Sequence, residues 1–308
     1  MKKWLFIFVM IFLATSLTVG CNSTDVTNQG LTVTDALGNE VTDVENPERI
    51  ISLIPSITET IFALGKGDQL VGRTDWCNYP EQVTEIASVG DMQFDVEKVL
   101  SLKPDLVLSH ESSAFSSEEG LEQLRNAGIT IVVVKNDTSI NDVLETIELI
   151  GEVIGTHEKA KQLTAEMNAS FTAISEKVAS ISEEDMVTVW VEVSPAPDIF
   201  TTGQGTFMHE MLELINANNS AGNLEGWVAF TEEDAVSLNP DVIVTTYGHY
   251  IENAADQVKS RQGWKEVTAV KNDRVYDIHS DKVTRSGPRL AEGVEELAAI
   301  IYPQIFGK

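Results

Sequence analysis

Short apolar runs alternate with amphipathic segments along most of the chain, which predicts a mixed α/β fold. Continuous apolar runs are typical of strands covered on both faces. They predict strands at 49–53, 70–72, 106–108, 129–134, 187–193, 242–244 and 274–278. Apolar residues at helical spacing lie between them, at 57–64, 120–126, 208–215, 263–267 and 289–301. Strands and helices in alternation favour mostly parallel sheets.

One segment occurs twice, at 97–108 and again at 233–244. Both copies read E-x-x-[VL]-S-L-x-P-D followed by three aliphatic residues, with Glu97 and Glu233 at their first positions. Each copy predicts a short helix capped by Asp95 or Thr231, a stop at the proline and a buried strand. Two lobes of similar construction are the simplest cause of such a repeat.

The segment between the copies predicts a long helix. Thr156 is a good N-cap, and residues 157–180 would form a helix of about 36 Å. We therefore predict two Rossmann-like α/β lobes joined by one long backbone α-helix. The predicted divisions are an N-terminal lobe at 31–155, the linking helix at 156–182 and a C-terminal lobe at 183–308.

The N-terminus has the pattern of an export signal. Two lysines precede an apolar run over 4–13, and a small-residue stretch leads to Gly20 and Cys21. The run is shorter than the roughly 20 residues of a spanning helix. We predict a signal peptide at 1–20, lipidation of Cys21 and a polar tether at 21–30, which would anchor the protein to the outer face of the cell membrane. An ordinary cleaved signal, with Cys21 there by chance, is the alternative.

The chain is strongly acidic, with a formal net charge of −27. Removal of residues 1–20 takes away Lys2 and Lys3 and no carboxylate, so the charge becomes −29. Such a charge argues against nucleic acid as a partner. Cys77 is the one cysteine besides Cys21, so the sequence offers no disulfide framework.

Ligands of open parallel sheets bind beyond the carboxyl ends of the strands. Several residues that follow the predicted strands are aromatic, and flat apolar faces with a few polar anchors suit a large planar ligand. Core packing explains any one aromatic residue equally well, whereas their shared position favours a site. The candidate ligand-binding residues are Pro55, Ser56, Trp76, His110, Phe200, Trp227, Tyr247, Asp281 and Arg285.

Catalysis and metal binding find little support in the sequence. G-x-S-x-G, H-E-x-x-H, a P-loop and the Rossmann fingerprint are all missing. A zinc or manganese site would need three or four converging ligands, and fewer than three of the five histidines lie at the ends of predicted strands. We expect no enzyme activity, no cofactor and no metal site.

Four motifs resemble the helical-backbone, or class III, solute-binding proteins of ABC importers. They are P-E-R-I-I-S-L at 47–53, P-S-I-T-E at 55–59, L-K-P-D-L-V at 102–107 and R-S-G-P-R at 285–289. Within this family the chain is most similar to the vitamin B12-binding members. The resemblance implies capture of cobalamin or a related corrinoid and its delivery to a membrane permease.

The resemblance also implies roles for the candidate residues. Trp76, Phe200 and Trp227 would contact the corrin ring, and Asp281 and Arg285 the amide side chains. His110 stands where family members have a tryptophan. Another expected tryptophan is missing from 90–93, which reads Gly-Asp-Met-Gln.

The repeated glutamates acquire a role by the same resemblance. Glu97 and Glu233 would pair with arginines on the two membrane subunits of the permease, and charge-assisted pairing at two points would fix the orientation of a monomeric binding protein. The sequence alone shows the same acid at the same place in both copies. A favourable interaction of each glutamate with its helix dipole is the alternative.

Haem or a ferric siderophore is the alternative ligand. Tyr247 or His110 could ligate haem iron, and Arg285 could hold an anionic siderophore. A corrinoid is favoured because its mostly neutral amides suit a site with few cations.

Overall fold

The computed structural model describes residues 32–42 and 46–307. Its first sheet, the N-terminal sheet, has the strand order β4-β3-β5-β6 with all pairings parallel. The aliphatic residues of these strands are buried, as continuous apolar runs predict. The strands are β3 (Ile50–Ser52), β4 (Leu70–Arg73), β5 (Leu106–His110) and β6 (Thr130–Val134).

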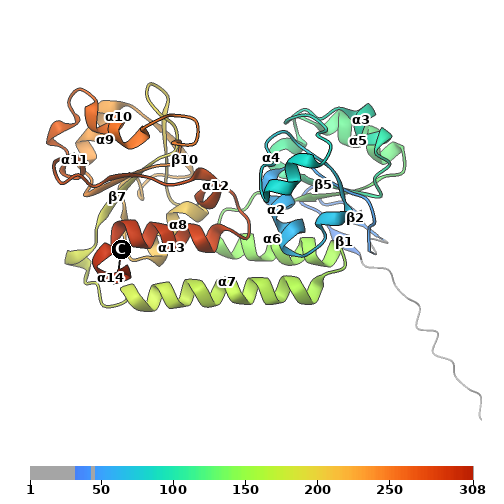
Figure 1. Cartoon of the computed structure of the whole chain (residues 1–308), viewed down its shortest axis with the longest axis horizontal. Helices are drawn as coiled ribbons and strands as arrows, with labels where there is room; N and C mark the ends of the chain where they lie inside the picture. Colours follow the sequence, from blue (N-terminus) through green and yellow to red (C-terminus); the bar gives the residue numbers. More distant parts are fainter. Residues whose placement is uncertain (1–31, 43–45, 308) are drawn as a thin grey trace, which may run out of the picture. The chain divides into compact units, whose positions relative to one another are not determined.

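The second sheet, the C-terminal sheet, is also parallel, with the order β12-β11-β7-β9. The sequence predicted three of its strands but not the short β9. Residues 46–134 are called the N-terminal lobe below, and residues 188–307 the C-terminal lobe (Figure 1). The strands of this sheet are β7 (Thr188–Glu192), β9 (Asn218–Asn219), β11 (Val242–Thr245) and β12 (Val275–Asp277).

Two antiparallel ribbons lie outside these sheets. β8 (Ile199–Thr202) pairs with β10 (Trp227–Phe230), and β1 (Val33–Thr34) pairs with β2 (Glu40–Val41). The sequence reasoning missed both ribbons, because their strands are too short or too mixed in polarity to give a clear period.

The helices of the repeat form where they were predicted. α3 (Val96–Ser101) is capped by the Asp95 side chain and α9 (Glu232–Leu238) by the Thr231 side chain. The predicted helix at 263–267 is instead a 3₁₀ turn followed by a short helix. The remaining helices of the two lobes are α2 (Pro55–Ala63), α4 (Glu111–Ala114), α5 (Glu118–Asn126), α8 (Phe207–Leu214), α10 (Ala254–Ser260), α11 (Thr268–Lys271), α12 (Ser280–Val283), α13 (Leu290–Ile301) and α14 (Pro303–Phe306), with 3₁₀ turns η1 (Gly67–Gln69), η2 (Glu81–Glu85) and η4 (Trp264–Glu266) and, just before β7, η3 (Glu183–Asp185).

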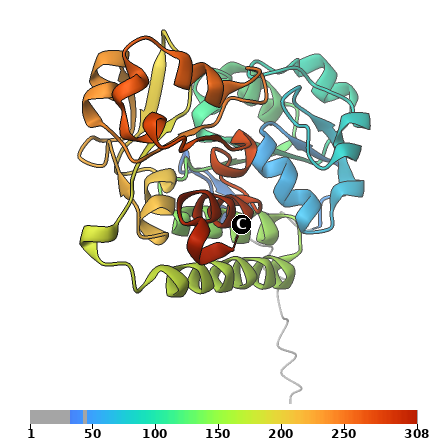
Figure 2. The same cartoon turned by 60° about the vertical axis from the view of Figure 1, so that its left-hand side comes forward.

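The predicted linking helix is present as α7 (His157–Val178). At 22 residues it is about 33 Å long. Thr156 precedes it, but its hydroxyl donates to the Gly151 carbonyl rather than capping the helix. The linking helix does not stand alone, because α6 (Ile140–Val153) lies beside α7 (Figures 1 and 2).

The helices α6 and α7 each contribute to two hydrophobic cores, one packed against the N-terminal sheet and one against the C-terminal sheet. On α6, Ile147 belongs to the core of the C-terminal sheet and Ile150 to that of the N-terminal sheet. On α7, Phe171 belongs to the core of the C-terminal sheet and Ala160 to that of the N-terminal sheet. Leu163 packs against both cores. The two sheets are therefore joined by continuous apolar packing.

The predicted signal peptide, the lipidated Cys21 and the tether lie outside the described residues. Among the residues that are described, no helix combines the length and the apolar character needed to cross a membrane.

The crossing of α6 and α7 gives a prediction. A Cβ added at Gly151 would overlap the Ala160 side chain, which is fully buried. Replacing a helical glycine by alanine ordinarily stabilises by about 0.5–1 kcal/mol, but overpacking costs about 1–3 kcal/mol. We expect Gly151→Ala to lower the free energy of unfolding measured by urea denaturation. Adding Ala160→Gly should recover part of the loss, and a Gly151→Ala protein more stable than wild type would contradict this packing.

Candidate functional site

The Trp76 loop, residues 74–79, follows β4 at the carboxyl edge of the N-terminal sheet. Cys77 is buried below it, with its sulfur 3.1 Å from the Thr58 hydroxyl and 3.3 Å from the Thr74 hydroxyl. The Trp76 side chain projects the other way and is 62% exposed. A large ring so far from any core is available to a ligand.

Two further apolar side chains at this edge were missed by the sequence reasoning. Met92 is 52% exposed, and Phe115, which ends α4, is 75% exposed. The Gly90 carbonyl accepts from the Asp75 amide at 2.8 Å, and the Ser117 hydroxyl donates to the Met92 carbonyl at 2.9 Å. These bonds bring the loops of Trp76, Met92 and Phe115 together. Met92 falls in the segment from which the expected tryptophan is missing.

The β8–β10 ribbon presents the aromatic residues of the C-terminal lobe. Trp227 lies opposite Thr202, and Ala229 opposite Phe200. Opposed residues share a face of a ribbon, as do residues two positions apart, so the Trp227 and Phe200 side chains are diagonal neighbours. Both remain partly exposed. The two rings therefore lie on the same, exposed face of the ribbon.

Tyr247 follows β11 as predicted, but the structure corrects its expected role. Its side chain is 1% exposed, and its hydroxyl donates to the buried Glu192 carboxylate at 2.5 Å. Arg261 binds the same carboxylate through two nitrogens, at 2.6 and 2.9 Å. Burial and the Glu192 charge raise the pKa of Tyr247 above its ordinary value. Tyr247 therefore belongs to a buried structural cluster of the C-terminal lobe.

His110 is also withdrawn from the surface. It is 5% exposed, and its Nδ1 lies 2.8 Å from the Ser112 hydroxyl and accepts from the Ser112 amide. Burial lowers the pKa of His110, an effect that the neighbouring Glu111 carboxylate opposes. The ring helps to begin α4, because its Nδ1 caps the first turn of that helix.

Pro55 and Ser56 begin α2 at the end of β3. Pro55 is partly exposed and keeps its place as a predicted contact, whereas Ser56 is 7% exposed. Ser56 lies against Gly287, since a Cβ added at Gly287 would come within 3.6 Å of the Ser56 side chain. The start of α2 thus touches the C-terminal lobe.

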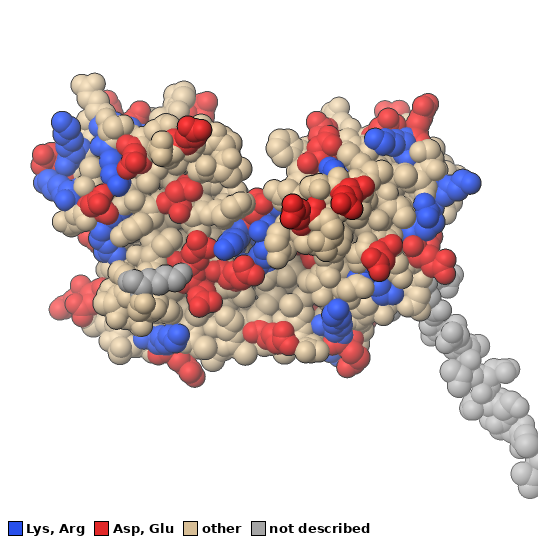
Figure 3. Space-filling view, viewed as in Figure 1, with Lys and Arg blue, Asp and Glu red and all other residues tan. Residues whose placement is uncertain are grey.

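Asp281 and Arg285 take part in an ion-pair network, here called the interlobe clasp, with Glu59, Asn78 and Arg289. Arg285 Nη1 lies 2.8 Å from Glu59 Oε1, and Arg285 Nη2 lies 2.9 Å from Asp281 Oδ1. Asn78 donates to Asp281 Oδ2 at 3.1 Å. Asp281 and Arg285 thus pair with each other and with the N-terminal lobe, and their role as ligand contacts stays a prediction. Figure 3 shows acidic and basic atoms in contact in this central region.

Arg289 completes the clasp. It binds Glu59 through Nε at 2.8 Å and Nη2 at 2.6 Å, and its guanidinium lies 4.1 Å from the centre of the Tyr79 ring. The Glu59 side chain is 2% exposed. A carboxylate buried so deeply is stable only when it is well paired, and two guanidinium groups supply that pairing.

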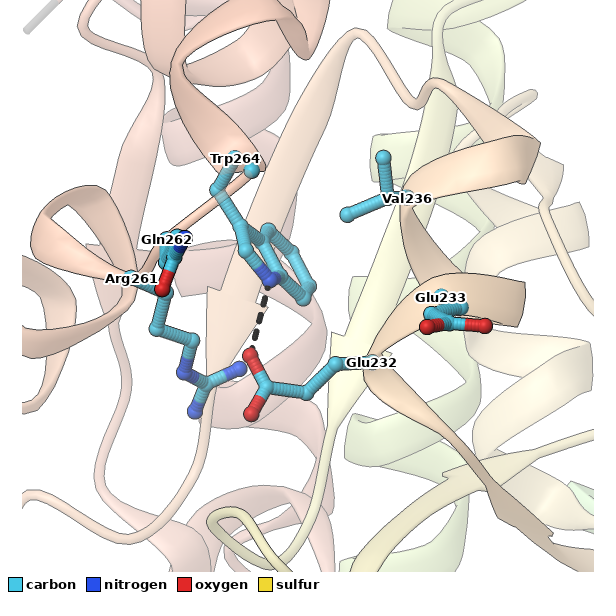
Figure 4. Close-up of a pocket in the computed structure, with 7 residues that line it drawn as sticks. Glu232, Glu233, Val236, Arg261, Gln262 and Trp264 are labelled. Carbon is cyan, nitrogen blue, oxygen red and sulfur yellow. Dashed lines mark hydrogen bonds between the residues drawn. The ribbon is translucent and has the colours of Figure 1, made fainter.

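Glu97 and Glu233 occupy the first turns of α3 and α9 and are exposed. Within the described chain, neither carboxylate forms a hydrogen bond or an ion pair. Glu232, next to Glu233, accepts from the Trp264 indole at 3.0 Å. Both glutamates line a recess of about 650 Å³. Figure 4 shows the Glu232 carboxylate turned towards the Trp264 indole, and Glu233 farther from that ring.

The described residues contain no group of three or more His, Cys, Asp or Glu side chains that could hold a metal ion. The candidate residues that the structure leaves well exposed are aromatic and apolar side chains from both lobes, Trp76, Met92, Phe115, Phe200 and Trp227.

Comparison with known proteins supports this interpretation of the fold. A family model described as "Periplasmic binding protein" matches residues 50–282. An uncharacterized ABC transporter substrate-binding lipoprotein of Bacillus subtilis, YvrC, is 47% identical over 99% of both chains. A cobalamin-binding protein of Halobacterium salinarum is 28% identical, over 87% of this chain and 73% of its own length.

Solved structures agree. A possible iron-binding (periplasmic solute-binding) protein of Staphylococcus epidermidis has a TM-score of 0.75 at 35% identity, covering 84% of this chain and all of its own. The vitamin B12-binding protein BtuF of Vibrio cholerae has a TM-score of 0.70 at 27% identity, covering 85% and 99%. The haem-binding protein HmuT has a TM-score of 0.74 at 26% identity, covering 89% and 90%.

The buried position of Tyr247 gives a prediction. Tyr247→Phe removes a hydrogen bond to a buried charge, so we expect the free energy of unfolding to fall by about 1–3 kcal/mol. Tyr250→Phe is the matched control, because Tyr250 is 56% exposed and its stability should change by less than about 0.5 kcal/mol. Urea denaturation measures both. Equal stabilities of the two variants would contradict the buried cluster.

Proposed function

The chain belongs to the periplasmic binding protein family, and from that premise we propose that it is the substrate-binding lipoprotein of an ABC importer and captures cobalamin or a related corrinoid. The observation that carries the proposal is the set of large exposed apolar side chains at the carboxyl edge of the N-terminal sheet and on the β8–β10 ribbon. A bare ion, a sugar or a small polar solute would leave this apolar surface unused. The proposed ligand contacts are Trp76, Met92, Phe115, Phe200 and Trp227, together with the partly exposed Pro55.

The chemistry of the exposed surface favours a corrinoid over an anionic chelate. Arg285, which donates to the Trp76 carbonyl, and Arg289, which lies over the Tyr79 ring, are paired with Glu59 and Asp281. They offer little free positive charge to a siderophore or to haem propionates. Neutral amides around an apolar ring need no such charge. The cobalamin-binding and vitamin B12-binding relatives point in the same direction.

Haem is the second candidate, and two histidines favour it. His249 and His279 follow β11 and β12, are exposed, and stack with ring centroids 6.0 Å apart. Either could be an axial ligand to iron. His110 and Tyr247, the iron ligands that the sequence offered, are both buried and hydrogen bonded.

Export and docking complete the proposal. Lipid on Cys21 would hold the protein at the outer face of the cell membrane, where it would act as a monomer without enzymatic activity. Glu97 and Glu233 would bind arginines on the two membrane subunits of the permease. Their exposure and lack of partners support this role, because an unpaired carboxylate can accept a bidentate arginine without first breaking another bond.

A ligand panel tests the substrate. We expect cyanocobalamin to bind the exported protein with release of heat in calorimetry, and Trp227→Ala to weaken that binding by about 2 kcal/mol, as loss of an aromatic anchor does. Leu37→Ala is the control, since Leu37 is exposed to a similar extent but lies between β1 and β2. If haemin binds and cyanocobalamin releases no heat, the ligand is haem and not a corrinoid.

Docking is tested by charge removal. We expect the double variant Glu97→Ala, Glu233→Ala to lose cobalamin uptake by cells while the purified protein binds cobalamin as before. The matched control is Glu122→Ala, Glu176→Ala, which removes two exposed carboxylates outside α3 and α9. If both double variants transport equally well, the glutamates are not docking residues.

A further inference from the structure

Arg285 of the C-terminal lobe reaches into the Trp76 loop. One guanidinium nitrogen donates to the Asn78 side-chain oxygen at 2.8 Å and to Glu59 at 2.8 Å. The other donates to the Trp76 carbonyl at 3.3 Å and pairs with Asp281. Three of these four acceptors belong to the N-terminal lobe.

The contacts fall on both sides of Cys77. Arg285 holds the backbone of Trp76 on one side. On the other side, Asn78 accepts from Arg285 and donates to Asp281. The exposed Trp76 ring therefore stands on a loop whose two flanks are bound to the opposite lobe. Contacts within the N-terminal lobe hold the loop at Asp75 and Cys77, whereas Arg285 of the opposite lobe donates to the carbonyl of Trp76 itself, whose ring is mostly exposed.

The clasp is built to hold the guanidinium in one place. Glu59 is buried and is bound by Arg289 as well as by Arg285, so its carboxylate has a fixed orientation. The Arg285 side chain is only 17% exposed. A planar guanidinium can satisfy four acceptors in fixed directions, whereas the single nitrogen of a lysine cannot.

We propose that Arg285 is a positioning residue for ligand capture: from the C-terminal lobe it fixes the backbone of the Trp76 loop, and with it the place of the Trp76 ring, on the N-terminal lobe. The ligand part of this inference rests on the proposed function. The positioning part does not, because it concerns the Trp76 loop alone. Separation of the lobes would then release the ring, so the capturing surface is complete only while the clasp is closed.

Cys77 provides a probe of the loop that needs no ligand. In a Cys21→Ser background it is the one thiol of the chain, and it is 2% exposed. We expect Arg285→Ala to make Cys77 react about tenfold faster with Ellman's reagent, because a loop with fewer anchoring bonds opens more often. Arg285→Lys should give an intermediate rate.

Lys282→Ala is the matched control. Lys282 lies on α12 next to Asp281 but pairs with Glu292 and Glu296 of its own lobe, so Cys77 should react as in wild type. Thermal unfolding of each variant shows whether the reaction is measured on folded protein. If Arg285→Ala unfolds, Asn78→Ala tests the same flank and should also accelerate the reaction. Folded variants that react at the wild-type rate would overturn the proposal.

A double-mutant cycle separates positioning from direct contact. If Arg285 acts through Trp76, Arg285→Ala and Trp76→Ala should each weaken cobalamin binding about tenfold, and the double variant should be no weaker than Trp76→Ala. Additive losses would mean that Arg285 contacts the ligand itself and would overturn the proposal. If cobalamin does not bind wild type, the proposed substrate is wrong, while the Cys77 rates still decide the positioning of the loop.

Discussion

The pairing of the buried Glu59 carboxylate with two arginines is the interaction on which the arrangement of the site depends. Glu59 lies on α2, whereas Arg285 and Arg289 lie between α12 and α13. Removal of one partner would leave uncompensated charge in a dry environment, which is strongly unfavourable. The requirement for pairing therefore holds the segment between α12 and α13 against α2. The same pairing neutralises the charges of Arg285 and Arg289, so these side chains add little positive charge to the surface that we propose for the ligand.

The repeat explains why each lobe has a capped helix with an exposed glutamate, followed by a buried strand. Each copy of the motif forms a capped helix followed by a buried strand, α3 with β5 and α9 with β11. The exposed glutamate begins each helix, and the carboxyl end of the strand leads to the ligand edge. One local sequence pattern thus supplies, in each lobe, an exposed glutamate at one end and a buried strand of the parallel sheet at the other.

Local patterns predicted the fold well and the site only in part. The strands, the caps at Asp95 and Thr231 and the helix α7 follow from periodicity and capping chemistry within short segments. Tyr247 was placed in the site because it follows a strand, but its partner Glu192 is 55 residues away. The partner of Arg285 is 226 residues away. Phe115 was missed because nothing near it in sequence shows that α4 leaves its ring uncovered. Whether such a side chain is exposed or buried depends on contacts between residues distant in sequence, which a local pattern does not show.

The sharing of α6 and α7 between the two hydrophobic cores has a consequence for how the protein folds. Ile147 and Ile150 are less than one helical turn apart, yet they complete different cores. Neither half of the chain could be excised without removing part of the other's interior. The molecule should consequently melt in a single cooperative transition, and cutting the gene between the lobes would yield two insoluble fragments rather than two domains.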